Sequence, residues 1–346
     1  MSLRTALVKT LTQCWILVAL AGFGVAASIP GFKVTKKYPI PGDGGFDYIL
    51  FDSSSNRLYV SHGTQVDVLD ADSGKLLGKV EGTPGVHGIA IVPDLHRGFT
   101  TNGGNSTVSI FDSNTFKITK TIAVAKAPDF IFYDPATKRV LVCHEDGEAI
   151  TALDPAKEVI IKKMELGTEA EAAVLDGKGT GFVNLEKANM IATFDSERLS
   201  VKQKWPIAGC KGPTPLGMDT LSARLFVGCR ESKTLAVLDA GSGKVIAMLP
   251  IGDTVDGIIY DPDNKLIFAS NGDGTVSVIR QKSANEYESA GYIQTQPSAK
   301  TMAFDPKTKR LFLSAVEIES VPAANGRRAR TRPKPGTLSV LVVDRQ

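Results

Sequence analysis

The sequence predicts an all-β protein, a seven-bladed β-propeller of four-stranded antiparallel blades closed by an N-terminal strand. The first observation behind this prediction is a repeat in which a short apolar strand ends in an aspartate or its substitute. A unit of about 40 residues with four strands is typical of a propeller blade. The seven anchors, spaced by 40, 42, 42, 43, 42 and 44 residues, are Asp52, Val92, Asp134, Asp176, Asp219, Asp261 and Asp305.

The second observation is that one repeat contains the pattern of four strands. Residues 48–51 are apolar throughout, which is typical of a strand buried on both faces, and we expect them innermost in the blade. Residues 57–61 and 66–70 predict the second and third strands. A turn in which Gly74 can adopt positive φ leads to the outer strand, residues 76–80.

The third observation is that the last repeat ends early. Residues 337–344 supply its third strand, and then the chain stops. A blade left open would expose a strand edge. Residues 32–40 form a strand pattern that belongs to no repeat, so we predict that they complete the seventh blade. The prediction is therefore one propeller domain over residues 28–346.

The first 27 residues differ from the rest of the chain. Arg4 and Lys9 precede an apolar run, and Val25-Ala26-Ala27 fits a small-residue cleavage site before Ser28. We predict a signal peptide over residues 1–27 and a periplasmic or secreted protein. A membrane anchor is the alternative reading, although the run is short for a span. No later segment of the sequence is apolar enough to cross a bilayer.

Charge and composition argue against a nucleic-acid-binding protein. The chain has a formal net charge of +3, and cleavage would remove Arg4 and Lys9 but no acid. A nearly neutral protein has no strong field for polyanions. Binding of single-stranded nucleic acid usually needs a basic groove with stacking aromatics, whereas aromatic residues make up 7% of this chain.

We expect the protein to be a monomer.

Three cysteines follow the signal segment. Cys210 precedes the fifth repeat and Cys229 ends its second strand, so both should lie at the same end of one blade. We predict a disulfide between them, which an exported location permits; two free thiols near a ligand site are the alternative. Cys143 occupies a position taken by small residues in other repeats and is expected to be a buried free thiol.

An insertion of about twenty residues, 317–336, separates the second and third strands of the seventh repeat. It is rich in proline and contains a basic cluster, so we predict a mobile loop. It is either a solvated loop or a clamp for an anionic ligand or nucleic acid. The basic residues are Arg327, Arg328, Arg330, Arg332 and Lys334.

Several motifs give the chain a family resemblance. They include Arg57-Leu58-Tyr59-Val60-Ser61-His62-Gly63, Val86-His87-Gly88-Ile89-Ala90, Phe182-Val183-Asn184-Leu185-Glu186 and Arg224-Leu225-Phe226-Val227-Gly228-Cys229. With these motifs the chain resembles the YncE-like, YVTN-repeat β-propellers of bacteria. The resemblance implies a seven-bladed, exported protein. Single-stranded DNA binding is attributed to some members of that family.

Position within a repeat predicts where a site would lie. The start of each innermost strand and the end of each second strand should meet at one mouth of the central channel. Residues five before and ten after the anchors therefore form two approximate rings on one face. The candidate ligand-binding residues there, with Arg230 beside them, are Asp47, His62, His87, Asp129, His144, Glu171, Glu186, Arg230, Asp256, Asn271 and Lys300. His96 should lie on the opposite face.

Imidazole and carboxylate groups that converge can bind a divalent metal or move protons. His62, His87 and His144 are the candidate metal ligands, and no cofactor is named by the sequence. We expect a binding protein whose face rich in histidine and carboxylate takes a ligand or partner. The alternatives are a metal-assisted hydrolase or lactonase, an oxidoreductase on the same face, or a protein that binds single-stranded nucleic acid. The simplest interpretation is that the polar residues at the blade ends only bond to backbone groups at the strand ends and solvate the channel.

Overall fold

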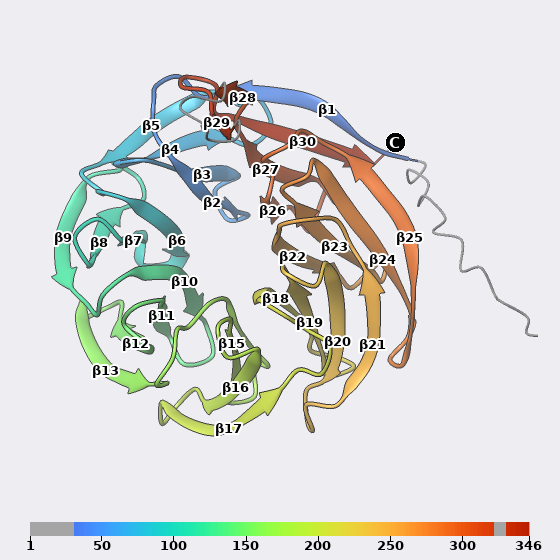
Figure 1. Cartoon of the computed structure of the whole chain (residues 1–346). Helices are drawn as coiled ribbons and strands as arrows, with labels where there is room; N and C mark the ends of the chain where they lie inside the picture. Colours follow the sequence, from blue (N-terminus) through green and yellow to red (C-terminus); the bar gives the residue numbers. More distant parts are fainter. Residues whose placement is uncertain (1–30, 322–329, 346) are drawn as a thin grey trace, which may run out of the picture.

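A computed structural model describes residues 31–321 and 330–345 of the chain. The predicted signal peptide, residues 1–27, and Ser28 lie outside the described residues. Seven four-stranded antiparallel sheets surround a central axis like the blades of a propeller (Figure 1). The predicted fold class is therefore confirmed.

Each of the first six blades is a meander in which consecutive strands pair from the axis outwards. Blade 1 consists of β2 (Phe46–Asp52), β3 (Arg57–His62), β4 (Gln65–Asp70) and β5 (Leu76–Glu81). Blade 2 consists of β6 (Val86–Val92), β7 (Arg97–Asn102), β8 (Thr107–Asp112) and β9 (Ile118–Ala123). Blade 3 consists of β10 (Pro128–Asp134), β11 (Arg139–His144), β12 (Ala149–Asp154) and β13 (Val159–Glu165). Blade 4 consists of β14 (Ala173–Leu175), β15 (Thr180–Leu185), β16 (Met190–Asp195) and β17 (Ser200–Pro206). Blade 5 consists of β18 (Pro213–Asp219), β19 (Arg224–Cys229), β20 (Thr234–Asp239) and β21 (Val245–Pro250). Blade 6 consists of β22 (Val255–Asp261), β23 (Leu266–Asn271), β24 (Thr275–Ser283) and β25 (Glu286–Gln294). A short 3₁₀ helix, η1 (Pro93–Leu95), joins β6 to β7.

The seventh blade joins the two ends of the chain. Its order is β26 (Thr301–Phe304), β27 (Leu311–Ala315), β30 (Ser339–Arg345) and β1 (Phe32–Pro39). Strand β1 runs antiparallel to β30, with Phe32 opposite Arg345 and Pro39 opposite Ser339. The predicted closure by an N-terminal strand is confirmed, and the two strands lie side by side in Figure 1.

The anchor aspartates fix the turn between the first and second strands of a blade. Asp52 Oδ1 accepts hydrogen bonds from the Ser54 amide and hydroxyl, 3.0 and 2.7 Å away. Asp134, Asp219, Asp261 and Asp305 likewise accept the amide of the residue two positions later. An aspartate that bonds to its own turn stabilises a tight reversal, which explains why this residue type marks the repeat.

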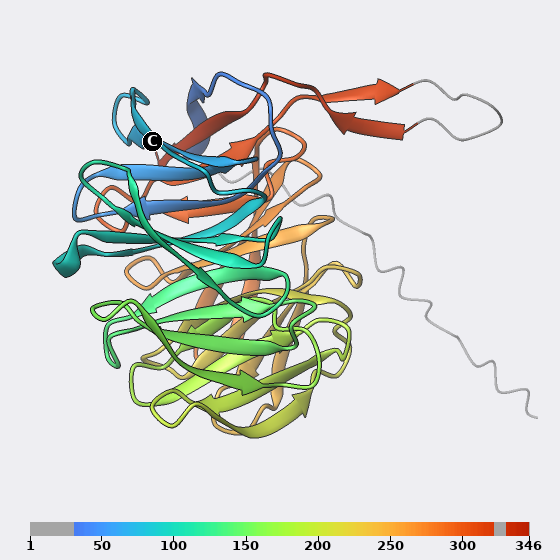
Figure 2. The same ribbon diagram turned by 90° about the vertical axis from the view of Figure 1, so that its left-hand side faces the viewer.

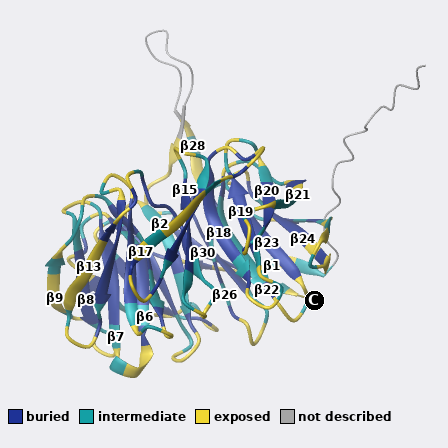
Figure 3. Ribbon diagram, turned by 90° about the horizontal axis from the view of Figure 1, so that it is seen from below, coloured by how far each residue is buried: buried dark blue, intermediate teal, exposed yellow. Residues whose placement is uncertain are grey.

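The core lies between the blades, and the outer strands and loops carry the exposed residues (Figure 3). Strands β3 and β4 are almost completely buried. The expectation that the innermost strand is buried on both faces is wrong for β2, because Tyr48, Leu50 and Phe51 are half-buried. One face of this strand packs on its blade, and the other borders a central cavity.

The predicted disulfide between Cys210 and Cys229 is present, with the two Cα atoms 5.3 Å apart. Within the described part of the chain the free cysteine is Cys143, which is buried as predicted. The bond joins the segment before β18 to the end of β19, and the two cysteines are 19 positions apart in sequence.

We expect that Cys229→Ser will lower the free energy of unfolding by about 3 kcal/mol, because the bond restricts the unfolded chain. Urea unfolding of the oxidised protein, with Cys143→Ser as the matched control, measures this loss. Equal midpoints for the oxidised wild type and Cys229→Ser would contradict a stabilising bond.

The segment 317–336, which we predict to be a mobile loop, contains regular secondary structure in its described part. Strands β28 (Ile318–Val321) and β29 (Arg330–Pro333) pair as a two-stranded hairpin. Arg332 Nε bonds to Glu319 Oε1 at 2.6 Å, and Lys334 Nζ lies 3.0 Å from Glu317 Oε2. These ion pairs offset part of the positive charge of the insertion. The hairpin stands out from one face of the disc (Figure 2), and Arg327 and Arg328 lie outside the described residues.

Among residues 31–321 and 330–345, the structure contains no helix of the length and apolar character that crossing a bilayer requires.

Candidate functional site

β-bulges place the candidate residues at the mouth of the channel. The register of β2 against β3 shifts between Phe46 and Ile49, and equivalent shifts occur at the start of β6, β10, β18 and β22. A bulge bends the strand and re-aims a side chain. The residues re-aimed in this way are Asp47, His87, Asp129, Thr214 and Asp256. The bulges thus direct side chains at the start of the innermost strands toward the candidate site.

Three of these residues meet on blades 1 to 3. His87 Nδ1 lies 2.7 Å from Asp47 Oδ2 and 3.2 Å from Asp129 Oδ1. The donor atoms of the three side chains all lie within 4.8 Å of one another. Asp129 is nearly buried, whereas the His87 side chain is 40% exposed. The triad is therefore buried at Asp129 and exposed to solvent at His87.

Hydroxyl groups fix the backbone of the triad. The Asp47 amide donates to Ser61 Oγ at 2.8 Å, and its carbonyl accepts the Thr301 hydroxyl at 2.6 Å. The carbonyl of Asp129 accepts the Thr101 hydroxyl at 2.6 Å. These bonds come from neighbouring strands and blades, so the positions of the carboxylates are set by the packed ring.

The other side of the mouth is a chain of ion pairs. Asp256 bonds to Arg230, and its other oxygen lies 2.5 Å from Lys300 Nζ. Lys300 Nζ is also 4.0 Å from Asp47 Oδ1, which joins this chain to the triad. Arg230 Nη1 lies 3.9 Å from Glu186 Oε1. We use the name mouth ring for the residues Asp47, His87, Asp129, Glu171, Glu186, Thr214, Arg230, Asp256 and Lys300.

Carboxyl groups outnumber cations in the mouth ring, and their pKa values respond. Burial raises the pKa of Asp129 to about 7, and the nearby Asp47 charge adds to the effect. Burial, then the charge of Asp129, raises the pKa of Glu171 to about 10. The hydrogen bond to Asp47 raises the pKa of His87 against the opposing effect of burial. At neutral pH this half of the ring therefore retains protons that a bound cation could replace.

The predicted second ring does not form, apart from Glu186. His62 is buried inside blade 1, where its Nδ1 lies 2.7 Å from Asp67 Oδ2 on β4. His144 is buried inside blade 3 with its Nε2 2.9 Å from Thr151 Oγ1, and burial lowers its pKa to about 4. Asn271 bonds to Thr275 and Ser277 within blade 6. The structure therefore does not bring His62 or His144 to His87 as a trio of metal ligands.

His96 lies at the other end of β6 from His87, immediately after η1. Its position on the opposite face agrees with the expectation from the repeat.

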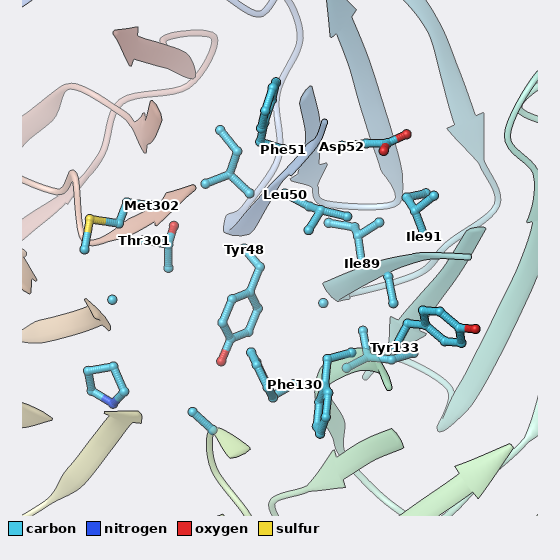
Figure 4. A pocket seen from close by; sticks show the side chains of 18 of the residues that line it. Tyr48, Leu50, Phe51, Asp52, Ile89, Ile91, Phe130, Tyr133, Thr301 and Met302 are labelled. Carbon is cyan, nitrogen blue, oxygen red and sulfur yellow. The ribbon is translucent and has the colours of Figure 1, made fainter. Parts of the chain in front are cut away.

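A central cavity of about 690 Å³ lies next to the mouth ring. Asp256 and Thr214 line it at the ring end, while the exposed residues Ser53, Asp94 and Pro135 line it at the other. The remaining lining is mostly apolar, and Figure 4 shows Leu50, Ile89, Phe130 and Met302 around it. The cavity thus has an apolar interior with polar residues at both ends.

Tyr48 connects the cavity to the triad. Its ring projects into the cavity beside Phe130, with the ring centroids 5.6 Å apart (Figure 4). Its hydroxyl donates to Asp129 Oδ2 at 3.2 Å. Sequence reasoning missed Tyr48, Phe130 and the cavity. The available signal was that each residue directly follows a ring position, and the alternation of a strand turns it to a different side.

The fold and the mouth ring define a seven-bladed β-propeller with a charged channel mouth. No protein-family profile matches the chain. No curated protein matches it either.

Solved structures share the fold at low sequence identity. The chain is similar to the RRP9 WD40 repeats, with a TM-score of 0.75 and 9% identity over 93% of this chain and 99% of that one. It is similar to a chain of a mitotic checkpoint complex, with a TM-score of 0.73 and 16% identity over 97% and 99% of the two chains. A third similar chain is from the Kuenenia stuttgartiensis hydrazine synthase, with a TM-score of 0.69 and 16% identity over 91% and 99%. These similarities show the fold alone.

Proposed function

We propose that this protein binds a small amphipathic molecule with a cationic group at the mouth ring. The single observation that carries the proposal is the position of the charged ring directly beside a cavity of about 690 Å³ with an apolar interior. Ligand sites are typically concave and mostly apolar, with a few polar groups that fix orientation.

The excess of carboxyl groups selects the charge of the ligand. Burial raises the pKa of both Asp129 and Glu171, so these carboxyl groups can hold protons near neutral pH; the charge of Asp47 adds to the effect at Asp129, and the charge of Asp129 adds to it at Glu171. The next residues, Phe130 and Ala172, line the cavity. An ammonium group at the two carboxyls would take the place of these protons while the apolar part of the molecule occupied the channel.

Two dyes with the same fluorophore and opposite charge test this proposal. Dansylcadaverine, the amine, should show a fluorescence increase with micromolar affinity, and dansylglycine, the acid, should bind at least tenfold more weakly. Met302→Trp places a larger ring at the cavity wall and should abolish the increase. Leu221→Trp is the matched control because Leu221 is 91% exposed.

Two results would refute the amphipathic-ligand proposal. One is a wild-type protein that binds neither dye. The other is an equal response from wild type and Met302→Trp, because a larger side chain at the cavity wall must weaken the binding of a ligand inside the cavity.

The same evidence bears on family and location. We propose that the protein is an exported, monomeric member of the YncE-like, YVTN-repeat propellers, supported by the repeat motifs. The Cys210–Cys229 bond supports an oxidising compartment, because disulfides persist in the periplasm and outside cells. The carboxyl-rich ring opposes a polyanion, so the structure adds no argument for nucleic acid at this face.

A further inference from the structure

We propose that Asp47, His87 and Asp129 bind one divalent first-row transition metal ion at the solvent side of the mouth ring. The first argument is the donor set. One imidazole nitrogen and two carboxylate oxygens from three different blades converge, and the three donor atoms lie within 4.8 Å of one another. Imidazole favours ions such as Zn²⁺, and carboxylates are accepted by Zn²⁺ and Mn²⁺ alike.

The second argument is spacing. Zinc ligands lie about 2.0–2.2 Å from the ion, so neighbouring donors around a tetrahedral ion are about 3.3–3.5 Å apart. His87 Nδ1 and Asp129 Oδ1 are 3.2 Å apart. His87 Nδ1 and Asp47 Oδ2, at 2.7 Å, would have to separate by well under 1 Å. The exposed outer side of His87 gives an ion access to this space.

The third argument is that neighbouring groups hold the donors in place. The Tyr48 hydroxyl donates to Asp129 Oδ2, while the other oxygen, Oδ1, lies 3.2 Å from His87 Nδ1. Such outer hydrogen bonds orient metal-binding carboxylates. The Asp47 backbone is fixed from two sides by Ser61 and Thr301.

Gly103 positions the imidazole itself. A Cβ atom at residue 103 would lie 2.7 Å from His87 Nε2 and 2.9 Å from its Cδ2. The absence of a side chain at Gly103 therefore leaves room for the His87 ring beside the turn, with Nδ1 near the two carboxylates. With three protein donors, the ion would keep coordination positions for water or for an oxygen of a ligand. The site shares Asp129 with the carboxyl pair proposed for the ammonium group, and its test needs no channel ligand.

Isothermal titration of the metal-stripped protein with ZnCl₂, followed by elemental analysis after dialysis, tests the metal site. We expect one ion per chain in the wild type. His87→Gln and Asp129→Asn should each weaken binding at least 100-fold, while His96→Gln, which changes an exposed histidine on the opposite face, should bind as the wild type does. Circular dichroism confirms that each variant is folded.

Gly103→Ala provides a second variant that removes no donor. It should weaken zinc binding at least tenfold by displacing the imidazole, and Gly45→Ala, whose Cβ would have no atom within 4 Å, should not. Titration of the wild type with Co²⁺ adds a readout without mutation, because Co²⁺ in a tetrahedral site absorbs visible light much more strongly than hydrated Co²⁺. A wild type that binds no Zn²⁺ or Co²⁺, or variants that bind as the wild type does, would overturn the assignment.

Discussion

Deletion of strand β1 is expected to unfold the propeller or to lower its free energy of unfolding by at least about 5 kcal/mol. Strand β1 supplies the fourth strand of blade 7 and pairs along its whole length with β30. It also buries Tyr38, a contribution of about 1.5–3 kcal/mol of apolar burial. Because a domain is stable by only about 5–15 kcal/mol, this loss affects the whole ring.

A point substitution measures the same contact more gently. The Tyr38 ring packs against Gly74 of blade 1, and its hydroxyl donates to the Asp72 carbonyl at 2.7 Å. Tyr38→Ala should therefore cost about 3–5 kcal/mol in urea unfolding. Lys33→Ala, at an exposed position on the same strand, should cost less than about 0.5 kcal/mol. Equal stability of wild type and Tyr38→Ala would show that β1 does not close the ring.

Substitution of Glu171 by glutamine is expected to make the protein more stable at alkaline pH. The pKa of Glu171 is raised to about 10 in the folded protein, against 4.5 for an ordinary glutamate. Between these two values the folded state binds more protons than the unfolded state, so stability falls as pH rises. Glutamine is neutral at every pH, has a similar shape and can still donate toward Glu186.

We expect Glu171→Gln to exceed the wild type at pH 9 by roughly 2 kcal/mol or more, and to approach it near pH 5. Urea unfolding across this range measures the difference. Glu165→Gln, on the exposed outer strand β13, should leave the pH dependence unchanged. The raised pKa values of Asp129 and His87 act in the same direction in both proteins and cancel in the comparison. Parallel stability curves for wild type and Glu171→Gln would contradict a buried protonated carboxyl group.

Much of the fold could be predicted because its signals are local or repeated. Each anchor aspartate stabilises its own turn, and each strand carries its own alternation, so seven copies fix seven blades. The Cys210–Cys229 bond could be predicted because the two residues lie at the same end of one blade. The hairpin β28–β29 was missed because its stability depends on cross-strand pairs such as Arg332 with Glu319. The pattern of a proline-rich segment does not predict such pairs.

The candidate site was predicted only in part. The innermost positions Asp47, His87 and Asp129 do meet at the channel mouth, as their shared offset from the anchors indicates. His62 and His144 share an equally regular offset but bond to Asp67 and Thr151 inside their own blades. A position in a repeat predicts the end of a strand at which a residue lies, but it does not predict the direction of the side chain.

By itself, the sequence determined the number of blades, the closure by β1 and the pairing of the cysteines, because these depend on chain spacing and strand pattern. The tertiary structure decided which polar residues form a site. The β-bulges at the start of the inner strands re-aim Asp47, His87 and Asp129 toward the axis, whereas the second strand is one strand further from it. The cavity beside the mouth ring exists because seven innermost strands meet around the axis without filling the space between them. That space is set by the closure of the whole ring, which no single repeat encodes.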